Sequence, residues 1–287
     1  ELTNSVEAGI ELKLLNHRVE LDLTYYNNLT KNQIMQVPLA ASSGYTSQWM
    51  NAGEISNKGL EVVLNVVPVQ TANFQWEATF NWSKNNNKVE KLNDQLKTLQ
   101  IASSFVALHA TVGKPYGELM GYNYVFDSEG NKVVAANGVY AKTAQTEGLG
   151  SVLPDWLGGV RNSFRYKNFD AGFLIDVRKG GYFYSITQQY GMYSGTLEET
   201  AANGIRENGL VLEGVQGTVA YNADGSYTVT NTRLNDKNVS AFEWGRSHSS
   251  GVQAQNVFKS DYVKLREITA GYTVPRLGDT AVKDVRF

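Results

Sequence analysis

The sequence predicts an all-β chain whose antiparallel strands form part of a transmembrane β-barrel. Three observations predict this fold class: apolar residues recur at every second position in several segments, these segments come in pairs joined by tight turns, and long stretches without such a period separate the pairs. Alternation with period two indicates a strand with one apolar and one polar face. Short turns at one end of a sheet and long loops at the other are typical of outer-membrane barrels.

The composition excludes several classes of protein. The chain has 287 residues, of which 42% are hydrophobic, so it can bury a core and is not disordered. Its net charge is −2 and it contains no long block of like charge, so we expect no nucleic-acid partner. It has no cysteine, which excludes disulfides and thiolate metal sites. It also lacks an apolar run long enough for a transmembrane helix, which leaves a barrel as the only membrane-spanning option.

Three predicted hairpins supply six strands. Their alternating segments lie at residues 6–14 and 19–25, 60–66 and 74–82, and 160–166 and 169–177. The connecting turns are expected at 15–18, 68–73 and 167–168, and a seventh strand at 261–275. The segments 27–57, 84–157 and 185–260 show no sustained period and are predicted to be loops. Loops of this length are uncommon in a compact soluble domain.

The two faces of the predicted strands differ in charge. Carboxylates and an arginine gather on one face, at Glu7, Glu11, Glu20, Asp22, Glu61, Glu77, Asp170, Asp176 and Arg178. Charge is costly in hydrocarbon, so in a barrel this face lines a watery lumen and the apolar face meets lipid. Aromatic residues near strand ends suit interface girdles. The alternative is a soluble carbohydrate-binding β-sandwich, in which the apolar faces pack against each other.

The seventh strand has an unusual pattern. In DYVKLREITAGYTVP (261–275), one alternating face carries Lys264 and Arg266 and then turns apolar from Ile268 onward. The two cations are predicted to lie at the outer rim of the barrel, where they would contact lipid phosphates or sugars. A β-bulge near Arg266 explains the pattern equally well, because it would exchange the faces and turn Val263 and Leu265 outward.

Several stretches resemble one family. NAGEISNKGLEVVLNVVPV (51–69), followed by FQWEATFNWSKNNNKVEKL (74–92), resembles the C-terminal half of SusC/RagA-type TonB-dependent transporters of Bacteroidota outer membranes. Further stretches resemble the same family in the same order: LDLTYYNNLTKNQI (21–34), VGKPYGELMGYNYV (112–125), LPDWLGGVRNSFRYKNFDAGFLIDVRKGG (153–181) and SDYVKLREITAGYTVP (260–275).

The resemblance implies a particular organisation. Residues 1–287 would be a partial TonB-dependent receptor barrel domain, one piece of a barrel of about 22 strands with short periplasmic turns and long extracellular loops. The plug domain of the family is absent from this sequence. An eight-stranded barrel complete in itself is the fallback.

The resemblance also implies a function. The expected activity is TonB-dependent import of a large nutrient, an oligosaccharide or peptide, across the bacterial outer membrane. The implied partners are a SusD-like surface lipoprotein that caps the loops, TonB acting through the missing plug region, and outer-membrane lipid. No enzymatic reaction and no cofactor is implied. Aromatic side chains able to stack on sugar rings are the predicted substrate contacts: Tyr45, Trp49, Tyr122, Tyr124 and Trp244. Packing inside a folded loop or against the cap protein is the alternative for each.

Other chemistry is weakly supported. His17, His109 and His248 are scattered without metal-ligand spacing, so we expect surface residues and no metal site. The segment DSEGN (127–131) is expected to be the turn of a loop hairpin rather than a calcium loop. A β-rich glycoside hydrolase would need two carboxylates facing each other across a cleft, and no such pair can be chosen from the sequence.

Overall fold

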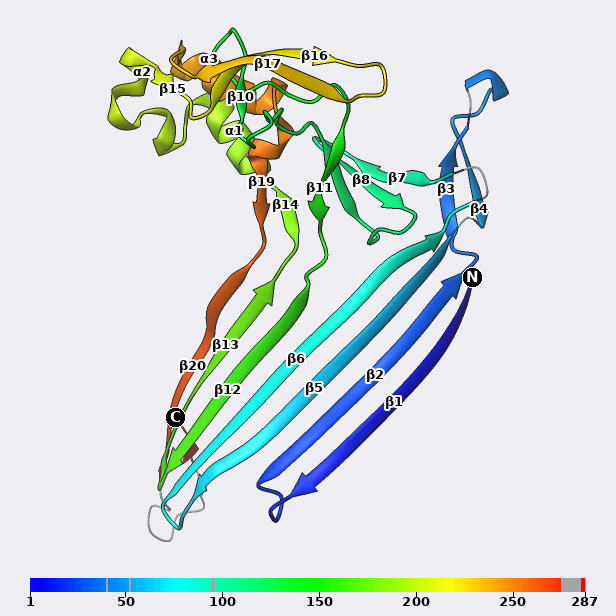
Figure 1. Ribbon diagram of the computed structural model, residues 1–287. Coiled ribbons are helices and arrows are strands. Elements are labelled where there is room, and N and C mark those ends of the chain that lie inside the picture. Colours follow the sequence, from blue (N-terminus) through cyan, green and yellow to red (C-terminus); the bar gives the residue numbers. More distant parts are fainter. Residues whose placement is uncertain (40, 52, 94–95, 275–284, 287) are drawn as a thin grey trace.

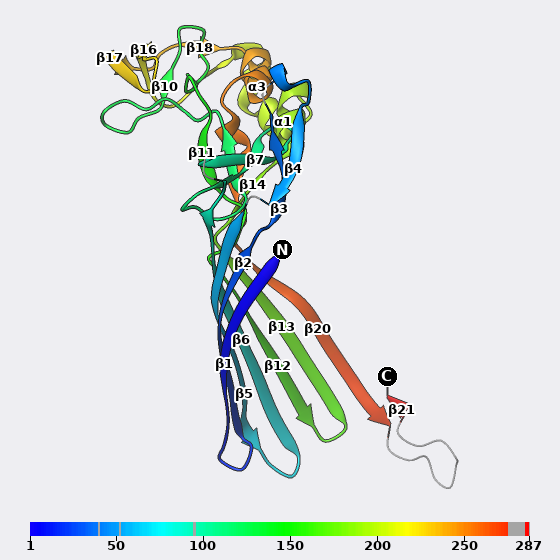
Figure 2. The ribbon, with the colours of Figure 1, turned by 90° about the vertical axis from the view of Figure 1, so that its right-hand side faces the viewer.

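Eight antiparallel strands form a single sheet, and the long connections between them form a crown at one end of it (Figure 1). The computed structural model describes residues 1–39, 41–51, 53–93, 96–274 and 285–286. The sheet follows the order β1-β2-β5-β6-β12-β13-β20-β21, and it is curved when seen from the side (Figure 2). Its strands are β1 Leu2–Leu14, β2 Val19–Lys31, β5 Glu54–Gln70, β6 Phe74–Lys91, β12 Trp156–Tyr166, β13 Phe169–Lys179, β20 Tyr262–Val274 and β21 Val285–Arg286.

The three predicted hairpins are confirmed as β1–β2, β5–β6 and β12–β13. The first turn places Leu15, Asn16 and His17 at positive φ, and the third has only two residues, with Lys167 at a φ of 52°. The seventh predicted strand is β20, although Pro275 at its predicted end lies outside the described residues. All these turns lie at the end of the sheet away from the crown (Figure 1).

The second turn begins later than predicted. Strand β5 continues past Pro68 to Gln70, because a bulge between Val66 and Val69 takes Pro68 out of the pairing ladder. Proline lacks an N–H and is tolerated in a sheet at such a place. The Arg18 guanidinium donates to the carbonyl oxygens of Val67 and Pro68 at 2.7–3.0 Å, so these carbonyls keep hydrogen-bond partners.

The sheet is one layer thick. Rows of apolar side chains cross the sheet on one face, as where Leu64 faces Leu21 on one side and Phe80 on the other. Among the residues that the structure describes, no second sheet lies against the apolar face: on β20, Val263, Leu265 and Ile268 are 74%, 59% and 73% exposed. The apolar faces therefore do not meet each other, as a soluble sandwich would require.

The pattern of β20 results from a bulge. Leu174 of β13 pairs with Glu267, and the next residue, Ile175, pairs with Leu265, so Arg266 is the extra residue. Before the bulge the odd-numbered residues of β20 lie on the apolar face, and after it the even-numbered ones do. The bulge explanation is therefore the one that the structure shows.

The crown has its own secondary structure. A hairpin, β3 Ile34–Pro38 and β4 Ser47–Asn51, precedes β5, with the 3-10 helix η1 Ala41–Ser43 at its tip. A four-stranded sheet combines β7 Thr98–Ser103, β8 Ala107–Thr111, β9 Glu118–Gly121 and β11 Glu147–Ser151. A three-stranded sheet combines β10 Val133–Val134, β16 Val215–Tyr221 and β17 Tyr227–Leu234.

The last long connection contributes short strand pairs and helices. Its pairs are β14 Tyr182–Tyr184 with β19 Val257–Lys259 and β15 Leu210–Val211 with β18 Asn238–Val239. Its helices are α1 Ile186–Ser194, η2 Glu198–Thr200, η3 Ala202–Gly204, α2 Ile205–Asn208, α3 Ala241–Ser250 and η4 Gln253–Asn256. None of the helices in the described part of the chain is both long and apolar enough to span a bilayer.

The predicted bounds of the loops were wrong. The sheet strands extend into the segments predicted to be loops, with β2 reaching Lys31 and β6 reaching Lys91. Near the crown, β6 carries Asn85 and Asn87 on one face and Lys84 and Lys88 on the other. Both faces are polar there, so pairing continues while the hydrophobic period disappears.

The apolar core lies in and under the crown. Its largest cluster packs residues of β3, β7 and β8 against Ile55 of β5 and Val89 of β6. The other members are Met35, Val37, Leu92, Leu99 and Ala110. The crown is thus a packed body fixed to the upper end of the sheet.

A charge on the apolar face of the sheet should be far more costly than the same charge on the polar face. We expect Ile268→Arg, in mid-strand, to destabilise the full-length protein in lipid vesicles by about 2–4 kcal/mol, because arginine then enters hydrocarbon. The neighbouring Thr269→Arg, on the opposite face, is the control and should cost less. Urea unfolding in vesicles measures both, and equal costs would contradict the assignment of the faces.

Candidate functional site

The polar face of the sheet carries ion pairs that cross from strand to strand. Arg161 of β12 donates to both carboxylate oxygens of Glu267 on β20, at 3.2 and 2.8 Å. Leu174 of β13 lies between them in the same row. Together with Gln75, Glu77, Arg165 and Asp170, the pair lines a hollow of about 370 Å³.

A second polar cluster forms at the bulge. Arg266 Nε donates to Asp176 Oδ2 at 2.8 Å, and the Tyr262 hydroxyl donates to the same oxygen at 3.0 Å. Lys264 Nζ lies 4.3 Å from the centre of the Tyr262 ring. Lys264 and Arg266 therefore lie on the polar face beside Asp176, and their contact with lipid or sugar at the outer rim stays a prediction.

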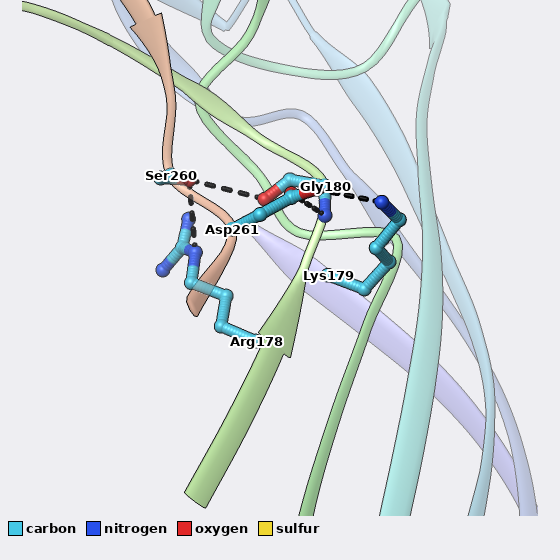
Figure 3. A network of polar contacts seen from close by, with 5 residues as sticks. All are labelled: Arg178, Lys179, Gly180, Ser260 and Asp261. Carbon is cyan, nitrogen blue, oxygen red and sulfur yellow. Dashed lines mark hydrogen bonds and ion pairs between the residues drawn. The ribbon is translucent and has the colours of Figure 1, made fainter. Parts of the chain in front are cut away.

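A network of polar contacts joins β13 and β20 where they enter the crown (Figure 3). Asp261 accepts from Lys179 Nζ and from the Gly180 amide, both at 2.6 Å. Ser260 Oγ accepts from Arg178 Nε at 3.0 Å and donates to the Gly180 carbonyl at 3.0 Å. We call these five residues the neck. It fixes the two chain segments that carry the helical part of the crown.

The neck also reaches the preceding loop. Arg178 Nη2 donates to the Val152 carbonyl at 2.9 Å, and the Asp155 amide donates to the Lys179 carbonyl at 2.8 Å. Gly180 has a φ of +80°, and a Cβ placed there would lie 2.4 Å from Asp155 Cγ. Only glycine fits this position, because both the left-handed backbone and the close approach exclude a side chain.

Two of the predicted substrate contacts are freely accessible. Tyr45, between η1 and β4 in the tip of the β3–β4 hairpin, is 72% exposed, and Trp49 on β4 is 66% exposed. The hairpin stands apart from the helical part of the crown in Figure 1. Such rings can stack on a ligand without any rearrangement of the chain.

The other three predicted contacts take part in packing. Tyr124 lies edge-on to Tyr140, with ring centres 5.1 Å apart, and burial raises the pKa of its hydroxyl far above the ordinary value. Trp244 packs against a buried cluster around Leu212. Tyr122 is half-buried, and Lys142 Nζ lies 4.4 Å from its ring centre. The five side chains thus do not gather at one place.

A group of aromatics on the crown helices was not foreseen. Tyr193 of α1 and Phe242 of α3 are exposed and line a hollow of about 370 Å³ with Arg206 and Thr200.

The capping signals of these helices were present in the sequence. Ser185 accepts from the Gln188 amide, and Ser240 accepts from the Glu243 amide, so serine stands three positions before glutamine or glutamate, as in a capping box.

His248 is buried, which corrects the expectation of a surface residue. It is 7% exposed, and its Nδ1 donates to Asn256 Oδ1 at 2.8 Å. Asn256 Nδ2 donates in turn to the Tyr184 hydroxyl, which donates to Gln189 Oε1. Burial lowers the pKa of His248 below its ordinary value. The network connects α3 with β14 and α1.

No cluster of three or more metal-ligating side chains occurs among the described residues.

The segment DSEGN (127–131) is confirmed as a turn. Asp127 Oδ1 accepts from the Glu129 and Asn131 amides at 2.9 and 2.8 Å, so its carboxylate is used to close the turn.

Comparison with known proteins establishes the family. A model of the TonB dependent receptor-like, beta-barrel family matches residues 1–257. The chain belongs to this family. Its members are receptors of the outer membrane, not enzymes, and the resemblance to SusC/RagA-type transporters is confirmed.

Similar proteins support the assignment. The chain is 26% identical to TonB-dependent receptor P3 of Formosa agariphila over 315 residues, which is 100% of this chain and 29% of the relative. It is 25% identical to TonB-dependent receptor SusC of Bacteroides thetaiotaomicron, over 64% of this chain and 20% of SusC. The chain therefore spans less than a third of the length of either relative.

A solved structure has the same fold. The RagAB peptide transporter matches with a TM-score of 0.67 at 15% identity, over 99% of this chain and 30% of that chain. The same importer in its open-open state gives a TM-score of 0.68 at 16% identity. The predicted fold class, a segment of a transmembrane barrel, is thereby confirmed.

Filling the space at Gly180 should loosen the neck. We expect Gly180→Ala to destabilise the crown by about 3 kcal/mol, since alanine would combine a strained φ with a clash against Asp155. Gly130→Ala is the matched control: its φ is +84° but no atom lies within 4 Å of an added Cβ, so it should cost only about 1 kcal/mol. Thermal unfolding of the two full-length variants compares them, and equal melting temperatures would contradict the clash.

The crown helices should loosen in acid. A histidine whose folded pKa is lowered keeps its full contribution to stability above its ordinary pKa of about 6.5 and loses it as the pH falls below that value, because the unfolded state binds the proton more readily. Hydrogen exchange of α1 and α3 amides, corrected for intrinsic rates, should show protection falling below about pH 6.5. His248→Asn should flatten this dependence and His17→Asn, in an exposed turn, should not. If the His248→Asn variant kept the pH profile of the wild type, another group would be responsible for the loss of protection in acid.

Proposed function

We propose that this chain forms part of the wall and the outer loops of a TonB-dependent importer that carries an oligosaccharide or peptide across the bacterial outer membrane. One observation carries the proposal: the sheet is a single layer with an uncovered apolar face on one side and a charged, ion-paired face on the other. A wall between lipid and water requires this arrangement. In a soluble sandwich the apolar face would be covered.

The dimensions of the wall fit a bilayer. Strand β12 has 11 residues, with Trp156 at one end and Tyr166 at the other. Ten steps of about 3.3 Å at a tilt near 40° give a height of about 25 Å, which matches the apolar band of such barrels. In this orientation the tight turns face the periplasm and the crown faces the outside.

The proposed partners follow from the family. A SusD-like surface lipoprotein would cap the crown, and TonB would act through a plug domain contributed by another part of the protein. Support comes from the likeness to SusC and to the RagAB assembly, which is described as a peptide transporter. The ion-paired face of the sheet would then line the path of the substrate.

The nature of the substrate depends on the crown. Trp49 and Tyr45 offer flat apolar surfaces with polar edges, which suit sugar rings and also peptide side chains. The hollow beside Tyr193 and Phe242 contains Arg206, whose guanidinium is already committed to the Gly195 carbonyl at 2.6 Å. We therefore place the first substrate contact on the β3–β4 hairpin.

Import can be tested in cells that carry the full-length protein in the outer membrane. Cells are grown on a panel of defined oligosaccharides and oligopeptides as sole carbon or nitrogen source, with the gene intact or deleted and with TonB present or removed. We expect growth on at least one of these compounds to require both the gene and TonB. Growth independent of either on every compound would contradict the proposal.

The Trp49 ring should contribute to capture. Trp49→Ala should weaken substrate binding by about two- to tenfold at unchanged protein level, because one stacking contact is lost. Trp244→Ala is the contrasting variant, since Trp244 packs inside the crown and its loss should lower stability. Binding to the purified full-length protein and its melting temperature separate these effects. Unchanged affinity in Trp49→Ala would remove the hairpin from the binding site.

A further inference from the structure

The apolar face of the sheet ends in a group of lysines on β5 and β6. Leu60 faces Lys84, Lys58 faces Asn86, and Ser56 faces Lys88, so the three lysines occupy three successive rows on the apolar side. All three are exposed. Below Lys84 the same face continues with Trp82 and Phe80, opposite Val62 and Leu64. The charge therefore begins directly above an aromatic and aliphatic surface.

The other side of these rows carries asparagine side chains, with the crown core above them. Asn57 Oδ1 accepts from the side chains of Asn85 and Asn87 at 3.0 and 2.9 Å, and Asn87 Oδ1 accepts from the Tyr116 amide. One row higher, Ile55 and Val89 are buried in the crown core. The lysines therefore stand on the side of these rows that faces away from the asparagine network and the crown core.

The lysines are poorly neutralised. Glu90 forms an ion pair with Lys88 at 2.7 Å and also accepts from Ser56 Oγ. Within the described ranges, no carboxylate forms a salt bridge with Lys58 or Lys84. Lys179, at the upper end of β13, differs because Asp261 lies 2.6 Å from its Nζ. Lys58 and Lys84 thus leave excess positive charge on the β5–β6 part of the rim.

We propose that Lys58, Lys84 and Lys88 bind the phosphate groups of a phosphorylated glycolipid in the outer leaflet. This inference rests on the proposed location in the outer membrane. Aromatic residues settle at the headgroup level of a bilayer, so Trp82 places the lysines where lipid phosphates lie. Lysine can cover apolar surface with its methylene chain while its ammonium group reaches the phosphate. Lipid is therefore favoured as the occupant over a soluble anion, which would gain nothing from Trp82.

The test counts lipids bound to the full-length protein in detergent by native mass spectrometry. The probes are lipid A and the same lipid after enzymatic removal of its phosphates. The variant is Lys58→Gln, Lys84→Gln and Lys88→Gln combined. The control, Lys97→Gln, Lys114→Gln and Lys237→Gln combined, removes the same charge from exposed crown positions. A gel shift between heated and unheated samples verifies that each barrel is folded.

We expect the wild type and the control to bind lipid A in preference to the dephosphorylated lipid. The variant should lose this preference, with affinity for lipid A reduced about fivefold for each lysine removed. An unchanged preference in the variant would overturn the proposal. If the variant with unchanged preference also loses a co-purified lipoprotein, the lysines contact that protein instead of lipid. The proposal would also be overturned if millimolar inorganic phosphate displaced the bound lipid while the protein did not distinguish lipid A from the dephosphorylated lipid. The number of bound lipids does not depend on import. The lipid-binding proposal and the import proposal can therefore fail independently of each other.

Discussion

Backbone pairing between neighbouring strands holds the sheet together, and in the described part of the chain no apolar layer packs against it. Every other feature depends on this constraint. A single layer has no core of its own, so its stability must come from the lateral ladder and from what each face meets. The uncovered Val263, Leu265 and Ile268 side chains need hydrocarbon, and the Arg161–Glu267 pair needs water or a polar partner. The two faces therefore require two different solvents.

Regular pairing is interrupted at a few places in the sheet. The bulge at Arg266 lets β20 keep its apolar residues outward along its whole length while the arginine turns to Asp176. The bulge at Pro68 lies close to the opposite end of the sheet, near the tight turns. At the crown end, the neck around Gly180 and Asp261 replaces the strand ladder with side-chain contacts. The neck thereby attaches a packed crown to a wall that has no core.

The sequence allowed the wall to be predicted and left much of the crown open. Period-two alternation identified the strands at 74–82 and 169–177 because their two faces meet different environments. It failed above Lys84, where both faces are polar although β6 continues to Lys91. The aromatic predictions relied on residue type alone, which could not distinguish the exposed Trp49 from the packed Trp244. That difference depends on contacts between segments far apart in the chain, such as the packing of Trp244 against the cluster of Val134, Leu212 and Val239. The same limit applies to His248, whose partner Asn256 becomes a neighbour only once α3 has formed.

The most direct test of the account is a cysteine scan along β13 and β20 of the full-length protein in lipid vesicles, read with a fluorescent label. This sequence contributes no cysteine of its own to interfere. Brominated lipid should quench labels at Phe173, Ile175 and Val177, and aqueous iodide should quench labels at Leu174 and Asp176. On β20 the lipid-quenched positions should be odd-numbered up to Leu265 and even-numbered from Ile268. Leu174 is decisive because it is apolar yet lies on the polar face in the row of Arg161. Quenching of Leu174 by lipid, or an alternation that does not change phase at Arg266, would contradict the account.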